Sequence, residues 1–431
     1  MFGAGRPGQQ RPDSGGPNGD DKSPQQARQN SEAGEHAARN RRPIRLWPGG
    51  GRPSNRIIGI AVVTGAVVAA GTAYAVTQTS GPGSAILAAS VPPMHVVAMS
   101  PGSANTGVDG ASPIMVSFSD QIAAKTARPS LSPSVPGRWT AHGNTMVFTP
   151  TVPFGPNTAV TLTVRGGPSG VKSVTGARLK ASVTARFRTA GYSQLALSEL
   201  LTEQGYLPMT FTPTSNGVTR AAHSEVSSPD PASLTPAGEA YSPPPGSFTF
   251  DSGYPSSLQS QWTPYSANVL LRGAVMAFES EHNMTVNADL NPKFWKALFL
   301  AQERGQRNQN GYTYAVADQR DPEYLTIYHD GHVVLRSLTN TGIPDSPTVN
   351  GTFPVYQKYR FQIMSGTNPD GSSYADPVSF VSYFNGGDAV HYFPRGGYGY
   401  QQSLGCVELP YTAAERAYPY LTYGSLVTVT G

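Results

Sequence analysis

The chain has 431 residues, of which 13% are charged, and its 47 glycines and 39 prolines make up about one residue in five. This composition favours many turns and mainly β structure, and it disfavours a helical bundle. A single cysteine excludes an intramolecular disulfide framework, a zinc ribbon and an iron–sulfur cluster.

Positive charge is concentrated near the N-terminus. Residues 1–56 carry ten basic and five acidic side chains, whereas the remainder has 21 basic and 22 acidic ones. Because the remainder has no basic excess to neutralise phosphates, we expect no nucleic acid among the partners. Residues 1–56 are also poor in aliphatic side chains, so they cannot bury enough apolar surface to fold, and we predict a disordered tail.

Residues 57–76 form an uncharged run, IIGIAVVTGAVVAAGTAYAV. A helix of this length rises by about 30 Å, which matches the hydrocarbon thickness of a bilayer. Arginines crowd its N-terminal side, so the positive-inside rule puts the tail in the cytoplasm and the rest of the chain outside. We predict a single-pass anchor in the cell membrane. The open alternative is a signal peptide cleaved after Ala73-Tyr74-Ala75, which would release a secreted protein.

Residues 92–190 have apolar side chains at every second position within short runs, as at Ile114, Val116 and Phe118. Turn residues separate these runs. The pattern predicts an antiparallel β-sandwich.

Residues 191–305 change to helical spacing. We expect a helix that stops at Gly205, followed by helices over 271–279 and 292–302. Between the first two helices the chain is dense in Ser, Pro and Gly, and this stretch is longer than most structureless loops. We interpret about 211–262 as an insertion or lid at the surface.

Three patches of this helical part, residues 200–207, 274–278 and 295–298, resemble the small three-helix peptidoglycan-binding module of bacterial wall enzymes. The resemblance implies that the module contacts glycan strands. The alternative is a helical spacer without a ligand.

From residue 312 to the end, strands return. Two apolar runs flank Asp330-Gly331, which predicts a hairpin. His329 and His332 lie at its turn, and the surrounding sequence offers no further Cys or His ligand, so we expect no metal site. No other motif in the chain indicates a cofactor.

The single thiol, Cys406, follows Gly405, and His391 lies fifteen residues upstream. A free thiol is only slightly ionised at neutral pH, so a nucleophilic cysteine needs a base within hydrogen-bond reach. A histidine in that place takes the proton and later returns it to the leaving amine. A glycine beside the thiol lets the backbone approach closely, as an oxyanion hole of peptide N–H groups requires. A buried structural cysteine is the alternative.

Residues 312–431 resemble the catalytic domain of L,D-transpeptidases, the YkuD-type family that cross-links bacterial cell walls. The family pattern is a histidine, a loop, then Ser/Thr-His-Gly-Cys, an apolar residue and Arg or Asn. His391, Ser403, Gly405 and Cys406 match it. A membrane anchor and an Ig-like domain often precede this domain. We therefore expect a mainly β multidomain chain, with an Ig-like β-sandwich, a small helical peptidoglycan-binding-like module and a β-rich L,D-transpeptidase catalytic domain.

The resemblance implies a two-step acyl transfer on peptidoglycan stem peptides. Cys406 attacks a donor tetrapeptide stem, the terminal D-Ala leaves, and the resulting thioester is resolved by an amine of a neighbouring stem, which gives a 3→3 cross-link. His391 acts as base and then as acid, and the backbone carbonyl of Tyr392 orients its imidazole. The N–H groups of Gly405 and Cys406 hold the oxyanion. Acylation of Cys406 by carbapenems is also implied.

Two positions depart from the family pattern, because Leu404 replaces the motif histidine and Glu408 replaces the Arg or Asn. We expect Arg395 to bind the substrate carboxylate instead, as a bidentate partner. Ser403 is expected to contact the substrate, and Tyr374 to belong to a lid over it. Two alternatives stay open: a carboxypeptidase that hydrolyses stem peptides, and an anchored wall-binding protein that has lost turnover through Leu404.

Overall fold

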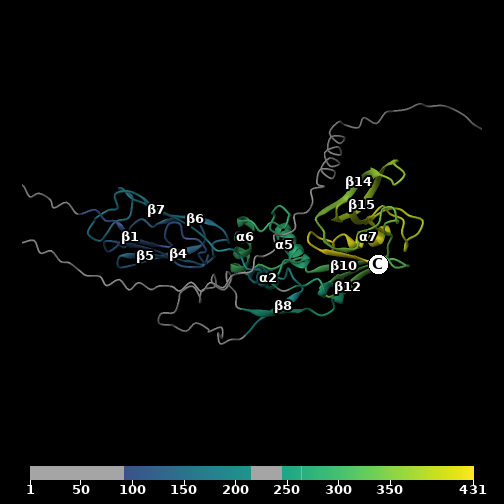
Figure 1. Cartoon of the computed structure of the whole chain (residues 1–431), viewed down its shortest axis with the longest axis horizontal. Helices are drawn as coiled ribbons and strands as arrows, with labels where there is room; N and C mark the ends of the chain where they lie inside the picture. Colours follow the sequence, from purple (N-terminus) through teal and green to yellow (C-terminus); the bar gives the residue numbers. More distant parts are fainter. Residues whose placement is uncertain (1–91, 215–244, 264) are drawn as a thin grey trace, which may run out of the picture.

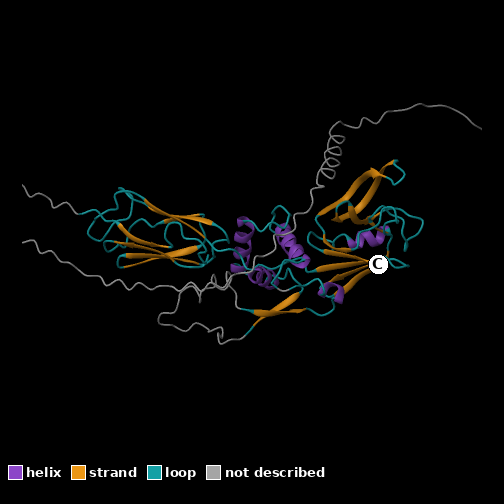
Figure 2. Cartoon of the chain, viewed as in Figure 1, coloured by secondary structure: helices purple, strands orange, loops and turns teal. Residues whose placement is uncertain are grey.

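The computed structural model describes residues 92–214, 245–263 and 265–431. The predicted tail at 1–56, the predicted span at 57–76 and the centre of the predicted insertion lie outside the described residues. Within the described ranges, no helix combines the length and the apolar character needed to cross a membrane. The described residues form three parts in chain order along the long axis: a β-sandwich, a group of helices and a second β-rich part (Figures 1 and 2).

The first part is a sandwich of two antiparallel sheets, as the alternating sequence predicts. One sheet has the order β1-β2-β5-β4 and the other β3-β6-β7. The inward residues of β2 and β6, such as Val116 and Leu162, are fully buried, because alternate side chains of a strand point to one face. The strands are β1 (Val96–Ser100), β2 (Ile114–Phe118), β3 (Ser130–Ser132), β4 (Gly137–His142), β5 (Thr145–Pro150), β6 (Ala159–Val164) and β7 (Val183–Arg188).

Each of the three longer helices is preceded by a residue whose side chain caps free N–H groups of the first turn. Ser193 caps α2 (Gln194–Glu203), Asn268 caps α5 (Val269–Glu281) and Asn291 caps α6 (Pro292–Glu303). The predicted end of the first helix at Gly205 agrees with the structure, where this glycine has φ +78°.

The structure describes both ends of the predicted insertion, and they form regular secondary structure. They pair as an antiparallel hairpin of β8 (Met209–Pro213) and β9 (Gly246–Phe250), followed by the short helix α4 (Ser256–Gln259). The rings of Phe211 and Phe248 contact each other across this hairpin, with centroids 4.9 Å apart and planes inclined by 48°. The hairpin joins residues that are far apart in the sequence, so no local pattern reveals it.

The helices share a core with the C-terminal part of the chain. Apolar residues of α2, α5 and α6 form one cluster with Tyr312, Tyr314 and Leu426. A Cβ atom placed on Gly273 of α5 would lie 2.5 Å from the carbonyl oxygen of Gly424, so these two backbones meet directly. This contact fixes the helical part against the β structure that carries the site.

The C-terminal part contains two sheets that pack on each other. The first is five-stranded, with the order β12-β11-β10-β18-β13, and the second is four-stranded, with the order β14-β15-β16-β17. Residues of both sheets form one buried cluster, which also includes α7 (Tyr411–Ala417). The strands are β10 (Thr313–Asp318), β11 (Tyr324–His329), β12 (His332–Leu338), β13 (Gly351–Pro354), β14 (Gln357–Thr367), β15 (Ser373–Asn385), β16 (Asp388–Tyr392), β17 (Val407–Leu409) and β18 (Leu426–Thr430).

The predicted hairpin around Asp330-Gly331 is present as β11 and β12. His329 hydrogen bonds through Nδ1 to the hydroxyl of Thr313, at 3.0 Å. Across the described ranges, no group of three or more His, Cys, Asp or Glu side chains is arranged to hold a metal ion.

Candidate active site

His391 lies on β16, and Cys406 directly precedes the adjacent strand β17. β16 and β17 pair in parallel, with His391 opposite Glu408 and Val390 opposite Val407. Val390 and Val407 face the five-stranded sheet in the buried cluster. The side chain of Cys406 packs on the other face of β16, against Ala389. The face of the four-stranded sheet that is turned away from the five-stranded one therefore carries Cys406 and His391.

The imidazole of His391 is held in one orientation. Its Nδ1 lies 3.0 Å from the carbonyl oxygen of Tyr392. Because a carbonyl only accepts, Nδ1 must carry the proton, and Nε2 is left as the acceptor. The side chain is 3% exposed, and this burial lowers the pKa of His391. The ring is therefore a neutral base at neutral pH, with the tautomer that general-base action requires.

The thiol of Cys406 is neutral at rest. Burial raises its pKa to about 12, the backbone N–H of Ala389 acts in the opposite direction, and the carboxyl groups of Asp388 and Glu408 raise it further. The sulfur lies 3.8 Å from the carbonyl oxygen of Gly387, to which it donates. Within the described residues no hydrogen bond links Sγ to the imidazole, so the expected direct contact is not formed here.

An aromatic wall surrounds the sulfur. Tyr383 is a member of a small buried apolar cluster. Cys406 packs against this cluster, and so do Tyr356, Tyr359 and Phe393. Burial raises the pKa of the Tyr356 hydroxyl to about 12, with Asp388 and the thiol as lesser causes. Cys406 itself is half-buried, so the wall leaves the sulfur accessible and presents flat surfaces to a substrate.

Tyr374, the predicted lid residue, lies within electrostatic reach of the thiol. Burial raises the pKa of its hydroxyl, and the charge of Cys406 is the next cause. Its ring lies across Gly366 of the neighbouring strand, because a Cβ atom there would fall 2.6 Å from the Tyr374 hydroxyl oxygen. The structure thus brings Tyr374 toward the sulfur, on a strand.

Ser403, the predicted substrate contact, is engaged within the turn that carries the thiol. It is fully buried, and its hydroxyl donates to the carbonyl oxygen of Cys406 at 2.6 Å. The hydroxyl oxygen of Ser403 in turn accepts the N–H of Gly405 at 3.3 Å, and this is one of the two N–H groups predicted to hold the oxyanion. Ser403 therefore closes the turn that presents the thiol, and its hydroxyl is engaged within that turn.

Arg395 is likewise already occupied. Its Nε and Nη2 donate to the two carboxylate oxygens of Glu408 at 2.8 and 2.7 Å, in a bidentate pair. The fork expected to receive a substrate carboxylate is thus closed by the acid that departs from the family pattern. Both groups act on His391 through space: Glu408 raises the pKa of its imidazole and Arg395 lowers it.

Asp388 is a site residue that sequence reasoning missed. Burial raises the pKa of its carboxyl to about 7, and a hydrogen bond from Asn385 acts in the opposite direction. A Cβ atom on Gly405 would lie 2.6 Å from Oδ1 of Asp388, and Gly405 has φ +110°, so only glycine fits there. An available signal was the position of Asp388, three residues before the expected base and directly after Gly386-Gly387.

Comparisons with known proteins agree with this arrangement at the level of domains. Residues 312–429 match the family described as the L,D-transpeptidase catalytic domain, and residues 89–189 match the bacterial Ig-like domain. The chain therefore carries an Ig-like domain followed, after the helical part, by an L,D-transpeptidase catalytic domain. No curated protein matches the chain. The predicted peptidoglycan-binding module has no counterpart among these matches.

Several solved structures are similar to parts of the chain. An L,D-transpeptidase from Mycobacterium smegmatis is 15% identical, with 79% of this chain and 100% of that chain covered and a TM-score of 0.26. The catalytic domain of the Enterococcus faecium L,D-transpeptidase is 28% identical, covers 27% of this chain and 95% of its own, and has the same TM-score of 0.26. L,D-transpeptidase 3 from Mycobacterium tuberculosis, in complex with a faropenem-derived adduct, is 15% identical, with 78% and 98% covered and a TM-score of 0.26.

Proposed function

We propose that this chain, whose C-terminal part is an L,D-transpeptidase catalytic domain, is a peptidoglycan L,D-transpeptidase that forms 3→3 cross-links through a thioester on Cys406. One observation carries the proposal. The parallel pairing of β16 and β17 brings the imidazole of His391 and the thiol of Cys406, the residue directly before β17, to one face. The Tyr392 carbonyl holds Nδ1 so that Nε2 can accept a proton.

The first half-reaction uses neutral groups. Rotation about the Cα–Cβ bond of Cys406 carries Sγ from Gly387 toward His391. As Sγ bonds to the carbonyl carbon of the third residue of the donor stem, Nε2 takes the thiol proton. The C–N bond to the terminal D-Ala then breaks, and the imidazolium gives its proton to the leaving amine. The product is a thioester on Cys406.

The second half-reaction reverses these proton transfers. An amine of a neighbouring stem attacks the thioester carbonyl, and His391 takes the proton that the amine loses. The C–S bond breaks, and the sulfur recovers its proton from the imidazolium. In both halves the N–H of Cys406 lies beside the oxyanion, and the N–H of Gly405 joins it by leaving the hydroxyl of Ser403.

In this proposal the pair of Glu408 and Arg395 has a positioning role. A carboxylate opposite the imidazole favours the imidazolium that forms during attack, and the guanidinium of Arg395 holds that carboxylate in place as a bidentate partner. The aromatic wall around the thiol would receive the stem peptide. The proposal extends to acylation of Cys406 by carbapenems, which replace the donor stem as acylating agent.

The proposal also sets the cellular location. Residues 57–76 anchor the chain in the cell membrane with the N-terminus inside, so the Ig-like domain and the catalytic domain lie on the wall side. Fractionation tests this part. The full chain should stay with membranes in high salt and leave them in detergent, whereas a chain recovered in the medium and lacking residues 1–75 would support signal cleavage instead.

Product analysis tests the reaction. A fragment of residues 92–431 is incubated with a disaccharide-tetrapeptide, and mass spectrometry follows D-Ala release and cross-linked dimer. Dimer with released D-Ala supports the transpeptidase. D-Ala release without dimer indicates a carboxypeptidase, and neither product, together with no carbapenem adduct on Cys406, indicates a wall-binding protein without turnover.

A further inference from the structure

The Ig-like domain differs in charge from the part of the chain that follows it. Residues 92–190 contain nine basic and two acidic side chains, whereas residues 191–431 contain twelve basic and twenty acidic ones. The near-neutral total of the chain after residue 56 thus conceals a strongly basic domain joined to an acidic remainder. A net charge of this size on one domain favours an anionic partner.

Five of the nine basic residues lie at one end of the sandwich. β6 ends at Val164 and β7 begins at Val183, and the loops between them hold four of the five, while the fifth follows β2. These residues are Arg165, Lys172, Arg178, Lys180 and Lys125. The opposite end, where β6 begins, meets the helical part, since a Cβ atom on Gly155 would lie 3.5 Å from the Trp295 side chain. The basic end is therefore the one remote from the catalytic domain (Figure 1).

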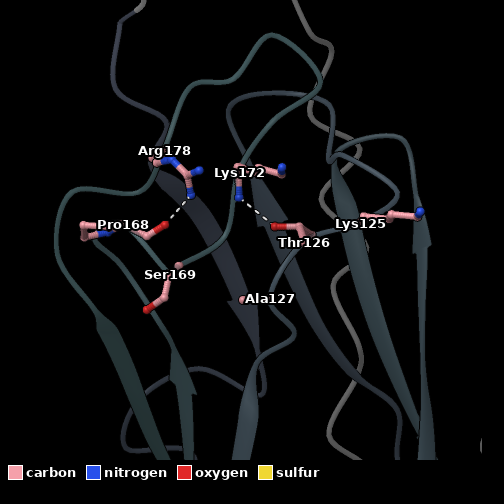
Figure 3. Close-up of a pocket in the computed structure, with 8 residues that line it drawn as sticks. Lys125, Thr126, Ala127, Pro168, Ser169, Lys172 and Arg178 are labelled. Carbon is pink, nitrogen blue, oxygen red and sulfur yellow. Dashed lines mark hydrogen bonds between the residues drawn. The ribbon is translucent and has the colours of Figure 1, made fainter.

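A shallow hollow opens between the loops of this end. Its volume is about 360 Å³, and three of the five basic residues line it: Lys125, Lys172 and Arg178. Figure 3 shows Arg178 donating to the carbonyl oxygen of Pro168 on one side of the hollow, at 2.6 Å, and Lys125 on the other side. Among the described residues, none of the three forms an ion pair. Lys125 and Arg178 are exposed, and Lys172 is half-buried.

The chain enters the domain at this same end. Met94 forms a parallel bridge with Leu179, which lies between Arg178 and Lys180. Residues 77–91 separate this entry point from the predicted span, and a chain of that length reaches at most about 50 Å when extended. Of the whole described structure, the basic end is thus tethered closest to the predicted anchor.

We propose that this basic end binds the anionic phospholipid headgroups of the membrane surface, with phosphates seated at the hollow. The proposal rests on the membrane-anchored orientation given under the proposed function. Its consequence is geometric, because seating this end on the bilayer directs the opposite end, with the helical part and the catalytic domain, away from the membrane and toward the wall. Each basic side chain near an anionic surface strengthens binding by about fivefold.

Vesicle sedimentation tests the proposal with the fragment 92–431, which contains every residue of the four described apolar clusters and so retains the cores. The fragment should bind vesicles of phosphatidylcholine mixed with phosphatidylglycerol, should not bind phosphatidylcholine alone, and should lose binding as salt is raised. The triple variant Lys125→Gln, Lys172→Gln, Arg178→Gln should bind roughly 100-fold more weakly.

The matched control removes the same charge elsewhere. Arg138→Gln, Lys293→Gln and Lys296→Gln alter three exposed residues away from the basic end, and this variant should bind nearly as well as the parent fragment. Lys125→Glu is a second test that spares the Arg178 hydrogen bond, and it should weaken binding by roughly 30-fold.

Three results would overturn the proposal: no binding to anionic vesicles, equal losses in the triple variant and its control, or binding to soluble polyglycerol phosphate without binding to vesicles. The last result would assign the basic end to a wall polymer. None of these measurements involves Cys406, so their failure is separable from failure of the proposed reaction.

Discussion

Replacing Arg395 should lower the stability of the protein more than replacing its ion-pair partner Glu408. Glu408 has a side chain only 5% exposed, and its charge is met by the bidentate guanidinium, with the amide of Asn340 as a distant third group at 3.5 Å. Arg395→Met would leave this carboxylate buried and unpaired, which costs about 3–5 kcal/mol. Glu408→Gln leaves an Arg395 that is 27% exposed and can reach water, so it should cost only about 1–2 kcal/mol.

The double variant Arg395→Met with Glu408→Gln completes the cycle. Without either charge the region should recover to within about 1–2 kcal/mol of the wild type. The assay is amide hydrogen exchange of the peptide that contains β17, since the N–H of Glu408 donates to the carbonyl oxygen of Asn340 at 2.9 Å. About 3 kcal/mol corresponds to roughly 100-fold faster exchange in Arg395→Met when opening is fast.

The two single variants should also shift the pH dependence of Cys406 acylation, which a loss of stability alone would not change. Glu408 raises the pKa of His391 and Arg395 lowers it. The acid limb of the Cys406 acylation rate should therefore move to higher pH in Arg395→Met and to lower pH in Glu408→Gln. Equal stability losses in both single variants, or shifts of the acid limb in the same direction, would refute the reasoning.

Two further variants test the surroundings of the thiol. Asp388→Asn removes a charge that raises the pKa of Cys406, so iodoacetamide should alkylate the thiol faster than in the wild type. Because burial raises the pKa of the Asp388 carboxyl to about 7, the ratio of the two alkylation rates should grow as pH rises through 7. A ratio that stays constant from about pH 5 to 9 would contradict this. Gly366→Ala should displace the Tyr374 ring and raise KM for the donor stem by roughly tenfold, about 1.4 kcal/mol. The control Gly396→Ala, which has open space around its Cβ, should leave KM unchanged. Equal KM values in both variants would show that Tyr374 does not contact the substrate.

The parts of the site that depend on chain neighbours were predictable from the sequence. The Tyr392 carbonyl lies beside the imidazole because these residues are adjacent in the chain. The parallel pairing of β16 and β17 brings His391 and Cys406 to one face of the sheet, as the pairing of a thiol with a base requires. The helix starts were also close to expectation, because side-chain caps such as Asn291 are local signals.

The errors concern partners that are distant in the sequence. Ser403 is buried because its backbone pairs with Thr341, about sixty residues earlier, and nothing in the local sequence indicates that contact. Arg395 was expected to bind substrate because Glu408 was treated as a lost function, whereas parallel pairing brings the two together as an ion pair. The hairpin of β8 and β9 was missed for the same reason.

The central claim is that Cys406 becomes acylated by a donor stem with the help of His391. Intact-mass measurement of the fragment 92–431 after brief exposure to a disaccharide-tetrapeptide tests it most directly. We predict a mass increase equal to the donor minus D-Ala, located on Cys406, absent in Cys406→Ser and much slower to form in His391→Ala at neutral pH. D-Ala release that persists undiminished in Cys406→Ser, or an adduct on another residue, would contradict the account.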